Sequence, residues 1–217
     1  MSYLGRSPTG SILTGADIAD GSISTAKIAD TAVSTAKIAD TAISTAKIAD
    51  DAVTVAKTSG VGITHASQWR MSSDVTGGVY PISANLEKVD TDGYSSIGSD
   101  MTVSSGLWTF PTTGKWLIRG HADVYFNGDS RHQHFSIYTT TDNSNYNLAS
   151  TAYMSIKQAE SNATQNSCEV DFFFDVTNTT NCKCLFAFEN LTNSGVTLAG
   201  GSSASYTWFT FLRLGDT

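Results

Sequence analysis

The sequence predicts an all-β domain that follows a segment of short repeats. Aromatic residues stand almost wholly after residue 60, since only Tyr3 among the 22 Phe, Trp and Tyr residues precedes that point. Runs within 61–217 alternate apolar and polar residues, and residues 11–60 repeat with a period of ten. The second segment can therefore build an aromatic core, whereas the first cannot build one by itself.

Composition excludes several classes of protein. The net charge of −7 does not suit a dedicated nucleic-acid binder, and 18 Gly with 3 Pro in 217 residues exclude collagen. No apolar run approaches the roughly 20 residues of a membrane span. The first residues lack the basic and then apolar pattern of a secretory signal, and three Cys do not suit a disulfide-rich scaffold. We expect an acidic protein that neither binds nucleic acid nor inserts into a membrane.

The repeats place branched apolar residues five positions apart. Such a spacing forms no continuous stripe on an α-helix, and on a flat strand it alternates between the two faces. Each repeat must therefore contain a bend, and we predict one helical turn capped by Ser24, followed by an extended Thr31–Val33. The residues expected to meet in the core of an intertwined trimeric stalk are Leu13, Ile18, Ile23, Ile28, Val33, Ile38, Ile43, Ile48 and Val53.

Two other structures fit the same repeats. A pentapeptide β-solenoid fits the pattern of a small residue followed two positions later by a branched one, although about 50 residues would make only two or three coils. A disordered linker fits the abundance of Ser, Thr, Asp and Ala, although it does not explain the regular Ile and Val. We favour the intertwined stalk, because three chains would bury these side chains on one another.

Residues 61–217 carry the alternation of half-buried strands. In Lys115–Phe126, one face collects apolar residues and the other collects Lys, Arg, His and Asp. The same alternation of apolar and polar residues occurs in Cys168–Val176, Asn181–Phe188 and Tyr206–Leu214. Turn signals such as Ser104-Ser105-Gly106 separate these runs. The thiols of Cys182 and Cys184 lie on the same strand face and are expected to be buried as small hydrophobic groups. Many strands without a helical period predict a sandwich or jelly roll.

Two stretches of this segment carry a family resemblance. Gly106-Leu-Trp-Thr-Phe-Pro-Thr-Thr-Gly-Lys-Trp116 resembles a motif of the complement/tumour-necrosis-factor jelly-roll superfamily, and Ser203–Leu214 looks like the family's last strand, with Thr210 in place of an expected Gly. The resemblance implies a ten-strand jelly roll that assembles as a trimer. The residues it implies for the core and trimer contacts of this head are Trp108, Phe110, Trp116, Phe172, Phe174, Tyr206, Trp208 and Phe211.

The N-terminal segment carries a second resemblance. Its Met-x-Tyr-Leu-Gly-Arg-x-Pro start and its Thr-Ala-Lys-Ile-Ala-Asp repeats resemble fibre and appendage proteins of tailed bacteriophages. The resemblance implies a virion protein with a docking tip over 1–10, a stalk over 11–60 and a jelly-roll head over 61–217. Tyr3, Leu4 and Arg6 would then contact other virion proteins.

No motif for catalysis stands out. The sequence has no Gly-x-Ser-x-Gly, no His-Glu-x-x-His and no phosphate-binding Gly-rich loop, so we expect no enzyme and no organic cofactor. His132 and His134 lie two residues apart on one strand face, where a threefold axis would bring six imidazoles around a transition metal. The simpler alternative is a solvated strand face.

Polar loops on a rigid jelly roll are the expected place for recognition. Tyr125–Asp129, Asp142–Tyr146 and Ala159–Asn166 are rich in Asn, Ser, Thr and Tyr, which suits a host-surface glycan or protein. The residues singled out are Tyr125, Asn127, Asp129, Asn143, Asn145 and Tyr146. The function expected is adhesion of a phage to its host. The alternative is a capsid decoration protein that stabilises the particle, and a third possibility is an enzyme that cleaves surface polysaccharide.

Overall fold

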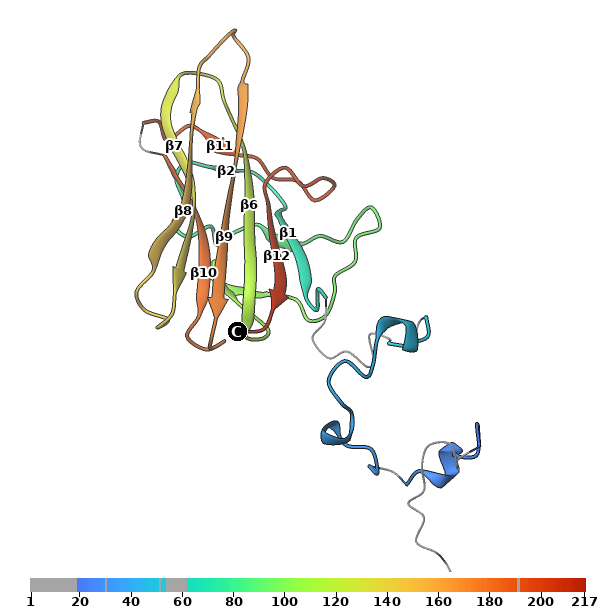
Figure 1. The fold of residues 1–217 in the computed structure, drawn as a ribbon. Coiled ribbons are helices and arrows are strands. Elements are labelled where there is room, and N and C mark those ends of the chain that lie inside the picture. Colours follow the sequence, from blue (N-terminus) through green and yellow to red (C-terminus); the bar gives the residue numbers. More distant parts are fainter. Residues whose placement is uncertain (1–18, 30, 51, 54–61, 191) are drawn as a thin grey trace, which may run out of the picture. The chain divides into compact units, whose positions relative to one another are not determined.

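The structure is a computed structural model that describes residues 19–29, 31–50, 52–53, 62–190 and 192–217. The chain divides into two compact units, residues 1–57 and 58–217. Figure 1 shows them as a chain of short helical turns and a β-sandwich. Each unit is described by itself below.

The first unit repeats one local conformation every ten residues. A 3-10 turn forms in each described repeat, η2 (Thr25–Lys27), η3 (Thr35–Lys37) and η4 (Thr45–Lys47). The predicted helical turn is therefore confirmed. Ser44, which stands where Ser24 stands two repeats earlier, has an extended backbone at the N-cap position but makes no side-chain capping hydrogen bond.

The segment between two turns differs from the prediction. Thr31 and Thr41 have φ of 66°, in the left-handed region, so the expected extended conformation at Thr31 is wrong. The reason is a tight turn in which the amide of Ala32 donates to Ala29 O at 3.0 Å, with the same bond from Ala42 to Ala39. In the turn types II and I′, the residue before the donor takes a positive φ, as Thr31 and Thr41 do here.

A lysine closes each repeat on itself. The Nζ atoms of Lys27, Lys37 and Lys47 donate to the carbonyl oxygen five residues earlier, at 2.6 to 2.7 Å. The bonds are local, and the described part of this unit forms no β-ladder, as a pentapeptide solenoid would require. Local bonds fix the shape of the repeat but bury none of its branched side chains.

The second unit is a sandwich of two antiparallel sheets, a seven-stranded one and a five-stranded one (Figure 1). The first sheet contains β1 (Ala66–Met71), β2 (Val75–Thr76), β3 (Leu86–Lys88), β6 (Gly114–Phe126), β9 (Thr164–Val176), β11 (Thr197–Leu198) and β12 (Trp208–Gly215). The second contains β4 (Thr102–Ser104), β5 (Leu107–Thr109), β7 (Ser130–Thr140), β8 (Asn147–Ile156) and β10 (Lys183–Asn190). The described part thus has twelve strands, two more than the ten that the first resemblance implies, and two of the twelve, β2 and β11, are only two residues long.

The chain passes back and forth between the sheets, which is the jelly-roll arrangement. The first sheet has the order β3-β1-β12-β6-β9, with β11 and β2 beside the far half of β6, and the second has the order β4-β5-β10-β7-β8. The long strand β6 pairs with β9 along its whole length. The predicted turn at Ser105 and Gly106 joins β4 to β5, and both residues have positive φ.

The two sheets enclose one aromatic core. The predicted inward face of β6 is confirmed, because Trp116, Ile118 and Val124 are buried in this core, whereas Phe126 at the end of the strand is half-buried. Gly120 sits in the same row because two rings leave no room there. A Cβ on Gly120 would lie 2.7 Å from carbon atoms of both Phe135 and Phe186.

Candidate functional site

A row of apolar side chains crosses the outer face of the first sheet. In the strand register, Phe173 of β9 lies beside Leu117 of β6, Leu117 beside Leu212 of β12, and Leu212 beside Ala66 of β1. An isolated bridge extends the line from Ala66 to Ile97. These five residues are called the apolar row. Phe173 is 70% exposed although it stands in the middle of a regular strand.

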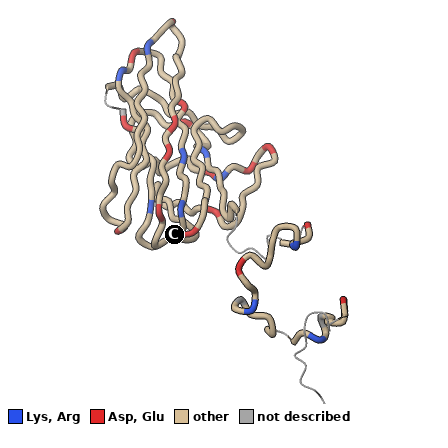
Figure 2. The backbone as a smooth tube through the Cα atoms, viewed as in Figure 1, with Lys and Arg blue, Asp and Glu red and all other residues tan. Residues whose placement is uncertain are grey.

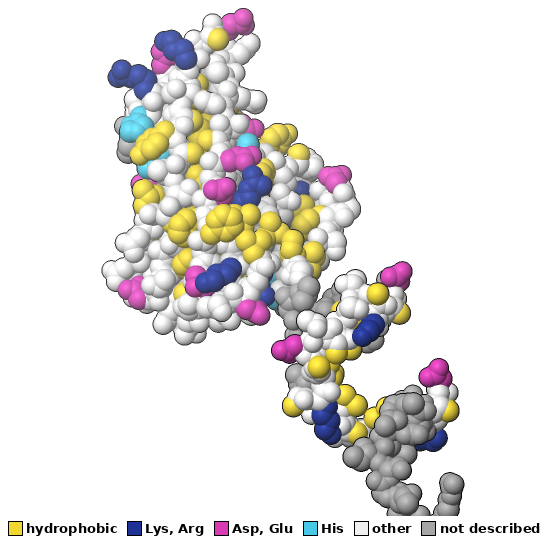
Figure 3. Space-filling model, in the orientation of Figure 1, with side chains coloured by type: hydrophobic (Ala, Val, Ile, Leu, Met, Phe, Trp, Pro, Cys, Tyr) yellow, Lys and Arg dark blue, Asp and Glu magenta, His cyan; other side chains and the backbone are white. Residues whose placement is uncertain are grey.

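Charged side chains border the apolar row along the strands. Lys115 pairs with Asp175 on one side of it, and Arg119 pairs with Glu169 at 2.8 Å on the other. Beyond Arg119, the His121 ring stacks on the Trp208 indole with centroids 5.5 Å apart. Figure 3 shows the hydrophobic band across β9, β6 and β12 with charged groups on both sides. An apolar strip with a polar border is the usual anatomy of a protein interface.

Most of the residues predicted for the head core or trimer contact lie inside the sandwich. Trp108, Phe110, Trp116, Phe174 and Phe211 are buried, and Phe172 packs against them from the edge. Tyr206 and Trp208 lie on the outside instead, Tyr206 exposed and Trp208 partly covered. The apolar row itself was not singled out from the sequence, because its members come from strands far apart in the chain.

The predicted core residues of the stalk are exposed in the single chain. Those in the described repeats are between 41% and 58% exposed, namely Ile23, Ile28, Val33, Ile38, Ile43, Ile48 and Val53. Leu13 and Ile18 lie outside the described residues, as do the predicted docking residues Tyr3, Leu4 and Arg6. Regular exposure of Ile and Val leaves a periodic apolar surface along the repeats.

His132 and His134 share the outer face of the second sheet, as their spacing predicted. Their ring centroids are 6.2 Å apart, and both rings stack against Tyr153. Within the described residues, no group of three or more His, Cys, Asp and Glu side chains has an arrangement that could hold a metal ion. The predicted metal depends on further copies of the chain and stays a prediction.

Two of the three predicted recognition loops meet at one end of the head. The turn between β6 and β7 is tied to the loop after β8, because Asn127 Oδ1 accepts from Gln158 Nε2 at 2.7 Å and Asp129 pairs with Lys157. The Lys157 hydrogen bond, helped by the backbone amide of Gln158, holds the pKa of Asp129 below its ordinary value. Figure 2 shows basic and acidic residues together at this end.

The third loop lies at the opposite end of β7. Asp142 accepts hydrogen bonds from the backbone amides of Asn145 and Ser144 at 2.8 and 2.9 Å, which lowers the pKa of this carboxyl well below its usual range. Asn143 has a positive φ in the same turn. The Tyr146 hydroxyl is buried without a hydrogen-bond partner, and burial raises its pKa. Asn143, Asn145 and Tyr146 are therefore not brought together with Asn127 and Asp129.

Tyr125 belongs to a strand rather than to a loop. It is the next-to-last residue of β6, and its hydroxyl donates to Asp74 Oδ2 at 2.6 Å. This hydrogen bond is the main reason that the pKa of Tyr125 is raised. The side chain ties β6 to the segment before β2, so its hydroxyl is already engaged within the head.

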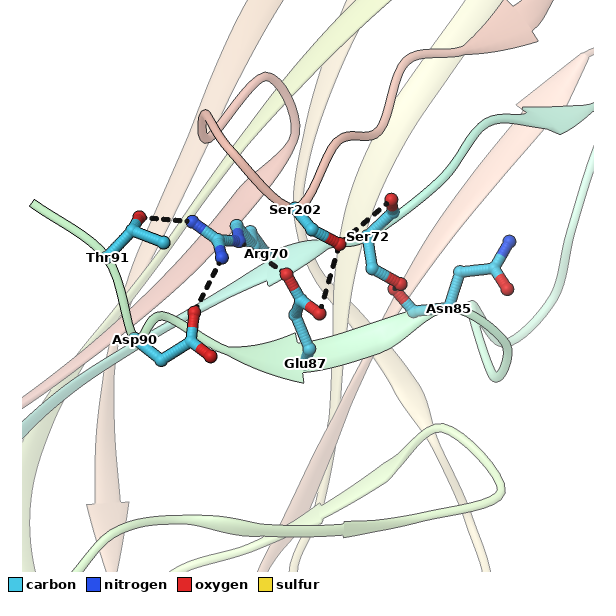
Figure 4. A network of polar contacts seen from close by, with 7 residues as sticks. All are labelled: Arg70, Ser72, Asn85, Glu87, Asp90, Thr91 and Ser202. Carbon is cyan, nitrogen blue, oxygen red and sulfur yellow. Dashed lines mark hydrogen bonds and ion pairs between the residues drawn. The ribbon is translucent and has the colours of Figure 1, made fainter.

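A buried arginine marks a structural clamp rather than a ligand site. Figure 4 shows Arg70 of β1 among residues of β3 and the segment after it. Its guanidinium donates to Glu87 at 2.7 Å, to Asp90 at 2.8 Å and to Thr91 at 3.0 Å, so each of its three nitrogens has an acceptor. Ser202 reaches Glu87 from another loop at 3.3 Å. Because Arg70 is almost fully buried and each of its nitrogens already has an acceptor, its guanidinium is not open to a ligand.

The thiols are buried, as predicted. Cys182 and Cys184 lie in the core, Cys168 lies at its edge, and all three are free. Burial raises the pKa of Cys168 to about 11 and that of Cys184 further, so thiolate chemistry near neutral pH is suppressed.

In the described parts of the chain, no helix has the length and apolar character needed to cross a membrane.

No family model matches the sequence. A search of curated proteins also returns no match. Among solved structures, Eiger TNF from S. frugiperda is similar with a TM-score of 0.50 and 15% identity, over 70% of this chain and 93% of that one. Murine APRIL matches at TM-scores of 0.46 (pH 8.5) and 0.49 (pH 5.0), with 12% identity over 69% of this chain and 98% of that one. The head thus has a TNF-like jelly-roll fold, as the first resemblance predicted.

Proposed function

We propose that this protein is a homotrimeric appendage protein of a bacteriophage virion, and that it acts by adhesion to the host surface rather than by catalysis. The observation that carries the proposal is the apolar row on the outer face of the first sheet. Phe173, Leu117 and Leu212 form a continuous strip there, and charged pairs border it on both sides. Burial of this strip against a second copy removes apolar surface from water and leaves the charges at the rim.

The repeats support the same assembly. Their Ile and Val side chains recur every five residues and are exposed in the single chain, while each repeat keeps the same local hydrogen bonds. Copies wound around a shared axis would bury these residues on one another. The number of three copies comes from the jelly-roll resemblance in the sequence, and the phage setting comes from the resemblance of the repeats.

The position of the polar loops supports adhesion. Ala66 at the start of β1 pairs with Leu212 near the end of β12, so the chain enters and leaves the head at one end. The loops that contain Asn127, Asp129 and Gln158 lie at the other end, beyond the last residues of β6. Three copies of such an end multiply weak contacts to a surface through effective concentration.

Light scattering of the full chain beside a 61–217 fragment tests the assembly. The expected mass of the full chain is 3 × 23.0 kDa, or 69 kDa, and the fragment should also be trimeric. Phe173→Asp should dissociate the fragment, because it places a charge in the apolar row. Leu148→Asp is the matched control, since Leu148 is exposed on the second sheet. A wild-type monomer in both forms would refute the proposal.

Labelled antibody on intact virions tests the adhesive role. Labelling of the tail, together with host-cell binding by the isolated protein, is the expected result. Labelling of the capsid without host-cell binding would replace adhesion by capsid decoration. Hydrolysis of host polysaccharide by the purified protein would instead favour an enzyme.

A further inference from the structure

A tyrosine on the second sheet rests on two imidazoles. Tyr153 of β8 lies opposite His134 of β7 in the register, and its ring stacks with His134 at 5.2 Å and with His132 at 5.1 Å between centroids. The interplanar angles are 29° and 24°, so the rings are close to parallel. Tyr153 is nonetheless 61% exposed, which leaves much of the ring open to solvent. Figure 3 shows histidines beside a hydrophobic side chain at this edge of the head.

The imidazole beneath the tyrosine is held in place. His134 Nδ1 lies 3.2 Å from Ser136 Oγ and 3.7 Å from Glu189 Oε2. The same Glu189 oxygen accepts from the Tyr138 hydroxyl at 3.0 Å, which contributes, after burial, to raising the pKa of Tyr138 to about 12. Side chains of β7 and β10 both hold the His134 ring. The ring beneath Tyr153 therefore loses little conformational freedom when a ligand contacts Tyr153.

Such an arrangement suits a ligand with one flat apolar side and a polar edge. A pyranose ring has this character, since its axial C–H groups stack on an aromatic face and its hydroxyls need hydrogen-bond partners. The exposed His132 ring can donate or accept, and the Glu189 carboxylate can accept. An apolar protein segment would instead cover the exposed His132 ring without offering its nitrogens a hydrogen-bond partner.

We infer that Tyr153, supported by His132 and His134, is a stacking site for a pyranose ring of a surface polysaccharide. The inference deepens the proposed adhesion and rests on it for the source of the sugar. It places recognition on the flank of the head formed by β7 and β8, and not only on the loops at its end.

Saturation-transfer NMR with the full-length protein tests the site. The probes are the methyl glycosides of glucose, galactose and N-acetylglucosamine at about 10 mM, where a millimolar dissociation constant is detectable. At least one probe should receive saturation at its ring C–H protons. Tyr153→Ala should weaken that binding by about tenfold or more, whereas Tyr153→Phe should keep it within about twofold, because the aromatic face remains.

The control variant is Tyr206→Ala, which removes another exposed tyrosine of the head and should leave binding unchanged. The inference is overturned if no glycoside binds, or if Tyr153→Ala binds as wild type. It is also overturned if Tyr153→Ala lowers the solution mass, because the ring would then belong to a subunit contact. A trimer that binds no glycoside refutes this site alone, whereas a monomer that binds one refutes the proposed assembly alone.

Discussion

In the head, aromatic and branched side chains from distant strands pack on one another within a single chain, whereas in the repeats the Ile and Val side chains of one chain face solvent. The head has this capacity because β6, β9 and β12 bring residues 38 to 100 positions apart into register. The repeats have only local bonds, such as that from Lys47 Nζ to Ala42 O. In the proposed stalk, their burial comes from other chains.

The same contrast appears between the two faces of β6. Its inner face contributes Trp116 and Ile118 to the core, and its outer face contributes Leu117 to the apolar row. The inner face is buried within one chain, whereas the outer face would be buried only against a second copy in the proposed assembly. Substitutions can therefore separate residues that stabilise the chain from residues that would stabilise the assembly.

The largest change is expected from Gly120→Ala in the core of the head. The new methyl group would lie 2.7 Å from two phenylalanine rings, so the rings must shift, at a cost of about 1–3 kcal/mol in the free energy of unfolding. Urea unfolding of the 61–217 fragment measures it. The control is Gly215→Ala, because nothing lies within 4 Å of a Cβ at that position. Equal stabilities for the two variants would show that the two sheets are not packed closely at this row.

The inner face of the head could be predicted from the sequence, and its outer face could not. Alternation along one strand identifies Trp116 and Ile118, because the period of two needs no knowledge of neighbouring strands. The apolar row needs the alignment of Phe173, Leu117 and Leu212, which depends on pairings between three strands. Taken alone, each of these residues is a single apolar side chain on a polar strand face, which is common on protein surfaces.

The candidate sites show the same limit. The spacing of His132 and His134 correctly placed both rings on one face, but their contact with Tyr153 follows from the pairing of β7 with β8. The left-handed turn in the repeats had a local signal that was missed. Gly21 stands in the second repeat at the position that Thr31 and Thr41 occupy in the next two, and all three have positive φ.

That turn gives a smaller prediction for the repeats. Thr31→Gly and Thr41→Gly should each stabilise their turn, because glycine takes a positive φ without the steric cost of a β-branched residue. Part of the gain is lost to the greater freedom of glycine in the unfolded chain, so the net effect is about 0.5 kcal/mol per site, or roughly twofold slower amide exchange. Exchange of the Ala32 and Ala42 amides in the full-length protein measures it.

The control for this prediction lies within the same repeat. Ala46→Gly changes a residue of the 3-10 turn η4 whose φ is not positive. Glycine there only increases the conformational freedom of the unfolded chain, so amide exchange in this turn should become faster. Slower exchange in all three variants would mean that the repeats are limited by something other than the left-handed residue.

The smallest effect is expected at an exposed carboxylate of the head. Asp142 accepts from the amides of Asn145 and Ser144, from the Asn145 side chain and from the Thr140 hydroxyl, which lowers its folded-state pKa. A lowered pKa stabilises the fold above the ordinary carboxyl pKa, and this stabilisation is lost as pH falls through the folded value. Asp142→Ala should therefore be less stable than wild type at pH 7, and the difference should shrink in acid.

Carbon-13 NMR of the Asp142 carboxyl over pH measures the cause directly. The midpoint in the folded head should lie well below that in an unfolded peptide of residues 139–147, because only the folded loop holds the four donors around the carboxylate. Equal midpoints would mean that the loop does not keep these hydrogen bonds in solution. The Asp142 loop lies at the opposite end of β7 from Asn127 and Asp129. If the host binds through the end that carries Asn127 and Asp129, Asp142→Ala should leave host binding unchanged. A loss of binding would instead place the proposed adhesive surface at the end that carries Asp142.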